Sequence, residues 1–115
     1  MNRERLTQMV TMLRALSEAP EVKFNLHDWH CGTSACAVGH ACLNPVFMDQ
    51  GLELTYWGAP RFDARSSWDA VTHFFEIDRE AAGHLFSDDA YKTGGNTEPA
   101  AVADRIESFL AGAEA

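Results

Sequence analysis

The feature that most constrains this chain is a run of small side chains in residues 34–43, which read SACAVGHACL. A hydroxyl group at Thr33 or Ser34 can cap a helix here by accepting the backbone N–H groups of its first turn. Asn44 and Pro45 then end that helix near Leu43. Because Ala, Gly and Cys side chains let neighbouring elements approach a helix closely, we predict that this helix is central and buried.

Apolar residues at helical spacing predict four further helices around it, at residues 2–18, 67–77, 79–86 and 98–110. Asp78 is expected to cap the third of these. Residues 52–57 alternate apolar and polar side chains, which is typical of a short strand. The predicted fold is therefore mostly α: a compact single-domain bundle of about five helices over residues 1–115, with one short β element near 52–57.

Composition and charge argue against a nucleic-acid-binding protein, a membrane protein and a secreted protein. The net charge is −8, and residues 61–115 carry eleven acidic and five basic side chains. Such a balance repels phosphate backbones, so we expect no direct binding of nucleic acid. No apolar run reaches the roughly 20 residues of a membrane span. The start of the chain lacks the pattern of a secretory signal, and three cysteines are an odd number for disulfides, so we expect a cytoplasmic protein.

Residues 27–43 contain all three cysteines and three of the five histidines. Thiolates and imidazoles are the donors that zinc takes in a tetrahedral site. Cys36 and His40 are four residues apart and so share one face of a helix. One hypothesis is therefore a zinc-stabilised module, although the spacing lacks the paired C-x2-C motif typical of such modules. The candidate ligands are Cys31, Cys36, His40, and either His27 or His30.

Two other interpretations of the cysteines stay open. A helix N-terminus stabilises a nearby thiolate, so Cys31 or Cys36 could serve a cysteine-based enzyme as nucleophile, or the two could form a reversible redox pair. Alternatively, Cys36 and Cys42 are small buried side chains, since cysteine is among the most buried residue types. The sequence favours this structural interpretation, and no catalytic residue is assigned.

Four aromatic residues lie in segments without a buried helical register: Trp29, Tyr56, Trp57 and Phe62. Aromatic side chains displayed on an acidic protein are typical of a surface that binds another protein. The function that we expect is therefore binding to a protein partner through these residues. Inhibition of the partner is one form that this function could take.

The stretch CGTSACAVGHA at residues 31–41 resembles a C-G-T-x-x-C-x-x-G-x-A motif in small proteins of bacteria and their phages, whose function is unassigned. Some of those proteins follow the motif with a helix pair that ends in Leu-Phe, as Leu85 and Phe86 do here. The resemblance covers roughly residues 29–91. It implies a bacterial or phage accessory protein, and it implies no activity, cofactor or catalytic residue.

Overall fold

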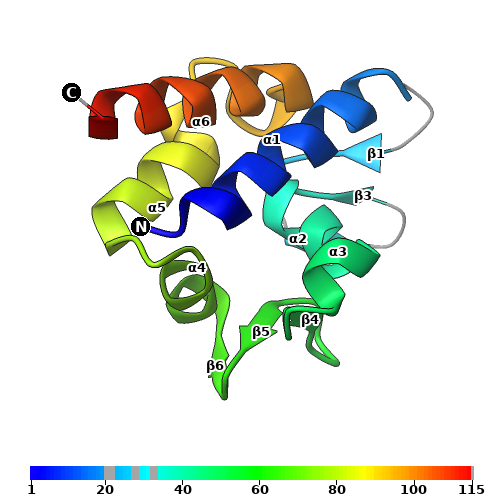
Figure 1. Cartoon of the computed structure of the whole chain (residues 1–115). Coiled ribbons are helices and arrows are strands. Elements are labelled where there is room, and N and C mark those ends of the chain that lie inside the picture. Colours follow the sequence, from blue (N-terminus) through cyan, green and yellow to red (C-terminus); the bar gives the residue numbers. More distant parts are fainter. Residues whose placement is uncertain (20–22, 27–28, 32–33, 115) are drawn as a thin grey trace.

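Among the residues that the computed structural model describes, helices dominate and two small β-sheets lie beside them (Figure 1). The structure describes residues 1–19, 23–26, 29–31 and 34–114, with the backbone alone at residues 30, 31, 34, 113 and 114. The helices are α1 (Arg3–Ser17), α2 (Ala37–Cys42), α3 (Pro45–Met48), α4 (Ser67–Phe75), α5 (Arg79–Phe86) and α6 (Pro99–Glu114). Two 3-10 turns, η1 (Asp88–Ala90) and η2 (Gly94–Asn96), join α5 to α6. The predicted mostly α class is confirmed.

The core lies between α1, α6 and the helices beneath them. Asn2 caps α1, because its Oδ1 accepts a hydrogen bond from the backbone N–H of Arg5 at 3.0 Å. The apolar stripe of α1 then packs against α6, which lies beside it in Figure 1. The largest fully buried side chains include four phenylalanines: Phe47, Phe74, Phe75 and Phe86. The helices therefore share one core, and no helix in the described part of the chain is long and apolar enough to cross a membrane.

Helix α2 is central and buried, but it begins later than predicted. Its N-cap is Cys36, whose Sγ accepts a hydrogen bond from the backbone N–H of Gly39 at 3.4 Å. The predicted cap Ser34 lies instead in a strand, and the other, Thr33, is outside the described residues. A helix cannot start while the backbone at residues 34 and 35 is extended and paired with neighbouring strands.

Those neighbours form the first sheet, in the order β1 (Lys23–Phe24), β3 (Ser34–Ala35), β2 (His30–Cys31). Strand β1 pairs with β3 in parallel, and β2 pairs with it antiparallel. The second sheet is an antiparallel meander of β4 (Glu53–Leu54), β5 (Pro60–Phe62) and β6 (Arg65–Ser66). Strand β4 lies within the β element predicted near 52–57, but the prediction did not include two sheets. Strands of two or three residues are too short to show a recognisable alternation of apolar and polar side chains.

Other helix ends follow from single residues. Asp78 caps α5 as predicted, since its Oδ1 accepts from the backbone N–H of Ala81 at 2.7 Å. Asn44 does more than end α2: it also caps the unpredicted helix α3, where Pro45 occupies the first turn.

One backbone contact fixes α2 against the first sheet. The carbonyl oxygen of Trp29 accepts a hydrogen bond from the N–H of Cys36 at 3.3 Å. A Cβ added at Gly39 would lie only 1.6 Å from that same oxygen. Any side chain at position 39 would therefore push α2 away from the strand that follows Trp29.

We expect Gly39→Ala to lower the free energy of unfolding by more than about 2 kcal/mol, because the added methyl group cannot be accommodated without moving backbone. Chemical denaturation with circular dichroism measures the change. The matched control is Gly112→Ala in α6, where an added Cβ meets nothing within 4 Å. That control should leave stability unchanged or raise it by up to about 1 kcal/mol. Equal effects of the two substitutions would contradict the packing argument.

Candidate functional site

The cysteine and histidine corner at the start of α2 is the first place where chemistry was predicted. Cys36 is 2% exposed. His40 is half-buried, and its ring stacks on Phe24 with the centroids 5.6 Å apart. Its Nε2 lies 2.7 Å from the carbonyl oxygen of Lys23. Because a carbonyl oxygen only accepts, Nε2 carries the proton, and Nδ1 is the ring nitrogen with the lone pair in a neutral imidazole.

The structure describes the other predicted zinc ligands only in part. His27 lies outside the described residues, and the structure gives only the backbone of His30 and Cys31, in β2 beside the strand that leads into α2. Within the described part of the chain, no three His, Cys, Asp or Glu side chains gather closely enough to hold a metal ion. The zinc ligands therefore stay a prediction.

Cys42 is a packing residue. It is 2% exposed at the end of α2. Burial raises the pKa of its thiol to about 12, with smaller electrostatic contributions from Cys36 and Glu53. A thiol with so high a pKa stays protonated near neutral pH and is therefore not an activated nucleophile.

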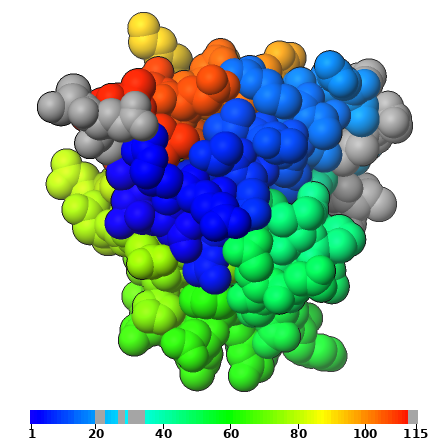
Figure 2. Space-filling view, in the orientation of Figure 1, coloured from blue at the N-terminus to red at the C-terminus, as the bar shows by residue number. Residues whose placement is uncertain are grey.

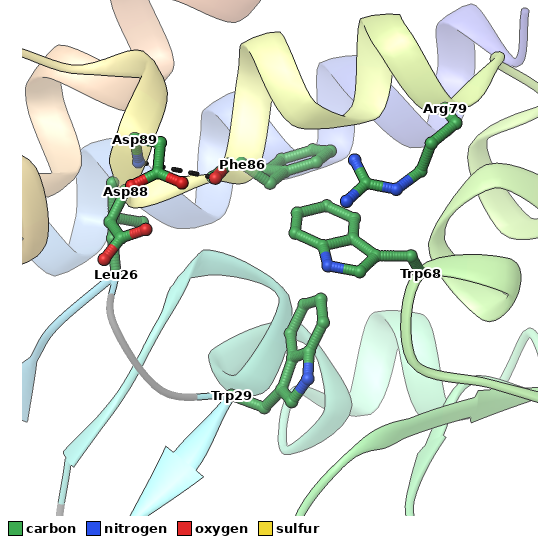
Figure 3. A pocket seen from close by; sticks show the side chains of 8 residues that line it. Leu26, Trp29, Trp68, Arg79, Phe86, Asp88 and Asp89 are labelled. Carbon is green, nitrogen blue, oxygen red and sulfur yellow. Dashed lines mark hydrogen bonds between the residues drawn. The ribbon is translucent and has the colours of Figure 1, made fainter.

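A cavity of about 290 Å³ lies where α4 and α5 meet the segment before β2 (Figure 3). Trp29 contacts Trp68 edge to face, with ring centroids 4.8 Å apart. The guanidinium of Arg79 lies 4.1 Å from the centroid of the same Trp68 ring, on the side away from Trp29 in Figure 3. Two carboxylates, Asp88 and Asp89, line the opposite end of the cavity. Trp29 is thus packed against other side chains, away from the remaining predicted partner-binding residues.

The second sheet carries the most exposed aromatic residues, at the lower end of the molecule in Figures 1 and 2, opposite α6. Tyr56 is 100% exposed and Trp57 is 77% exposed. They lie at the tip of a turn in which the carbonyl oxygen of Thr55 accepts from the N–H of Gly58 at 3.0 Å. The N–H of Thr55 donates to the carbonyl oxygen of Ala59 at 2.7 Å, and its Oγ1 accepts from the N–H of Ala59 at 2.9 Å. Three hydrogen bonds therefore hold the two rings out in water.

Beside these rings lies a hollow of about 500 Å³, which we call the hairpin groove. Its lining residues are Glu53, Leu54, Thr55, Tyr56, Trp57, Arg61, Ala64, Arg65 and Ser66. Arg61 lies directly across from Glu53 in the β4–β5 ladder, with Nε 3.5 Å from Oε1. Both side chains are more than half exposed, and Arg65 is also exposed. The groove is thus lined by two aromatic residues and two arginines.

Phe62 lies beneath this surface. Successive residues of a strand point to opposite faces of the sheet, so Phe62 faces inward where Arg61 faces out. Its ring contacts Phe74 edge to face at 5.0 Å, and the guanidinium of Arg5 lies 5.2 Å from its centroid. Of the four predicted aromatic residues, the structure therefore brings only Tyr56 and Trp57 together on the groove.

Sequence reasoning missed Arg61 and Arg65. The sequence did contain a signal for Arg61, because Pro60, Arg61 and Phe62 alternate apolar, charged and apolar side chains as a short strand does. In the structure, Arg61 is the exposed residue of the three. The reversal after Phe62 was hidden, because the turn is built from Asp63 and Ala64 at φ of 50° and 64°. Hairpin turns with positive φ usually contain glycine or asparagine, so this turn carries little signal in the sequence.

Comparison of the chain with protein-family models, curated proteins and solved structures finds no match. The resemblance of residues 31–41 to small bacterial and phage proteins accordingly stays a prediction. The function has to be inferred from the geometry of the groove and of the α2 corner.

The raised pKa of Cys42 predicts a loss of stability at alkaline pH. The unfolded chain releases this proton near pH 9 and the folded chain only near pH 12, so this stabilisation is complete below about pH 9 and is lost as the pH rises to about 12. Between these two pH values, the free energy of unfolding should fall with a slope that approaches about 1.4 kcal/mol per pH unit. Denaturation curves across this range should show a smaller slope for Cys42→Ala than for the wild type. Tyr91, whose pKa is also raised to about 12 by burial, contributes equally to both proteins. Identical slopes would contradict the assignment.

Proposed function

We propose that this protein acts by binding another protein, and that the hairpin groove is the binding surface. The observation that carries the proposal is the pair Tyr56 and Trp57, adjacent in sequence and 100% and 77% exposed beside two arginines. Tyr, Trp and Arg are the residue types that dominate the binding energy of protein interfaces. Each aromatic ring can bury about 150–250 Å² against a partner, which is a large favourable contribution.

The rigidity of the turn supports the same proposal. Ordering a mobile loop costs free energy upon binding, and a surface that is already ordered avoids that cost. The hydrogen bonds of Thr55 and the positive φ of 88° at Gly58 fix the turn before any partner arrives. A single exposed aromatic residue is common on protein surfaces. Two neighbouring ones on an ordered turn beside a groove are better explained by a partner.

A role as a bacterial or phage accessory factor in the cytoplasm, inhibition of the partner included, is the finer form of this proposal. It is supported by the resemblance of residues 31–41 and by the net charge of −8. An acidic surface can compete with phosphate for a basic groove on another protein.

A zinc-stabilised module is the second candidate, and the orientation of His40 favours it. Histidines that bind zinc usually donate their other ring N–H to a carbonyl oxygen or a carboxylate. His40 makes that kind of bond through Nε2 to the carbonyl oxygen of Lys23. Cys36 lies one helical turn earlier, and its Sγ accepts an N–H hydrogen bond from Gly39. Cys31 and either His27 or His30 would complete the set.

For the binding proposal, the double substitution Tyr56→Ser with Trp57→Ser should weaken retention of the partner by about 100-fold or more, because each hot-spot residue contributes at least about 2 kcal/mol. Affinity capture from a lysate of the native host, quantified by mass spectrometry, measures the loss. Met48→Ser on α3, where the side chain is 52% exposed, is the control and should retain the partner. All variants should melt as the wild type does, since the altered side chains are exposed. If the double variant retains the partner as well as the wild type does, the proposal is wrong.

For the zinc candidate, elemental analysis of untagged protein should give about one equivalent of zinc. Cys36→Ser should remove the metal, whereas Cys42→Ser should keep it, because Cys42 is buried at the other end of α2. Less than about a tenth of an equivalent in the wild-type protein would exclude a structural zinc site. Loss of zinc in both variants to the same extent would show that the effect is unfolding rather than lost coordination.

A further inference from the structure

We infer that the hairpin groove takes an acidic, extended segment of the protein partner. This inference rests on the proposed function and adds the chemistry of the partner to it. It starts from the placement of the arginines in a chain that carries 17 acidic and nine basic side chains.

Several other arginines are engaged within the fold. Arg5 donates to the carbonyl oxygen of Phe74 and lies over its ring. Arg14 pairs with Asp104 and Glu107 on α6. Arg105 donates to the carbonyl oxygen of Ala90 and lies over the ring of Tyr91. These three side chains hold elements of the fold together, whereas Arg61 and Arg65 line a groove that is open to solvent.

The pair of Arg61 and Glu53 shows how a ligand carboxylate would bind. The two side chains are 57% and 61% exposed, and their closest atoms are 3.5 Å apart. An exposed pair of this kind contributes at most about 1 kcal/mol. A guanidinium has five N–H donors, so one carboxylate at Nε leaves donors for a second. Glu53 therefore acts as a weak internal competitor for the site that a partner carboxylate would occupy.

The shape of the groove indicates an extended segment. Its lining comes from two turns at once: Tyr56 and Trp57 on the β4–β5 turn, and Ala64 with Arg65 on the β5–β6 turn. A ligand that reaches both must cross the face of β5 that carries Arg61 and continue over the β5–β6 turn, because Arg65 pairs with Phe62 and therefore lies on the opposite face of the strand. Its carboxylates would pair with Arg61 and Arg65 in the bidentate geometry that guanidinium favours, and its apolar side chains would cover the two rings.

Single-stranded nucleic acid is the rival ligand, since aromatic rings beside arginines also stack on bases. The charge of the chain argues against it. A nucleic acid carries one negative charge per nucleotide and depends on clustered cations over a long track. Here Glu53 lines the groove itself, Asp63 precedes the lining residue Ala64, and the net charge is −8. A peptide with two or three carboxylates meets much less repulsion.

The test begins with selection of random dodecapeptides on the purified protein. Selected peptides should be enriched in Asp and Glu next to apolar or aromatic residues. Synthetic peptides from this selection are then measured by fluorescence anisotropy against defined variants. Arg61→Gln with Arg65→Gln should weaken binding by about tenfold or more, because two charge-assisted contacts are lost. Glu53→Gln should tighten binding several-fold, since it removes the internal competitor.

The matched control is Lys23→Gln with Lys92→Gln, which removes the same charge from exposed side chains outside the groove lining. It should change affinity by less than about twofold. Selection of uncharged or basic peptides, selection of none, or an arginine variant that binds like the wild type would overturn the acidic partner. An oligothymidine that binds more tightly than the peptides and depends on the same arginines would overturn it in favour of nucleic acid.

The failure of this inference is distinguishable from failure of the proposed function. If Tyr56→Ser with Trp57→Ser abolishes retention of the native partner while the arginine variant retains it, the groove binds proteins without selecting acidic segments. If neither variant affects retention of that partner, the groove is not the binding surface and both proposals fall.

Discussion

The carbonyl oxygen of Trp29 determines how closely α2 can approach the first sheet. It accepts the N–H of Cys36 and occupies the space that any side chain at Gly39 would need. Because this contact is made by backbone, it cannot be relaxed by a change of rotamer. The small residues of α2 follow from it, since a helix held this close to its neighbours must be narrow on several sides. The buried position of α2 in turn lets α1 and α4 share one core with it.

Burial of α2 also determines the chemical reactivity of its cysteines. Cys42 is enclosed by apolar residues, and the raised pKa of its thiol removes it from chemistry near neutral pH. Cys36 uses its sulfur to cap the helix, a position that Ser, Thr, Asp or Asn usually fills. A sulfur in this role is held in place by the backbone of Gly39. The same placement suits a metal ligand or a purely structural cap, so the neighbourhood of His40 matters more than the cysteine alone.

The sequence predicted the helices whose apolar pattern extends over many residues. It failed where one or two residues determine the local structure. Apolar stripes located α1, α4, α5 and α6, and small side chains located α2 as a buried helix. The cap at Cys36 was missed because sulfur is a weak acceptor and hydroxyl residues stand nearby. Two-residue strands were missed because pairing with another segment defines them, and two residues are too few to show an alternating pattern of their own. The groove arginines were missed for the same reason: only the pairing of β5 with β6, which sets Arg61 opposite Ser66 and Arg65 opposite Phe62, brings both residues to the lining of the groove.

The second sheet concentrates features that stability alone does not require. Asp63 and Ala64 in the β5–β6 turn adopt positive φ, as does Ser67 where β6 runs into α4, and this conformation is unfavourable for residues other than glycine. The Asp63 carboxylate lies 3.1 Å from Nε2 of His73, and this contact holds the strained turn against α4. Two aromatic rings are meanwhile kept in water by a hydrogen-bonded turn. Unfavourable backbone and unburied rings at one end of a well-packed domain have a common explanation if this end is shaped for a partner, because rigid, exposed loops on a stable scaffold are where binding residues concentrate.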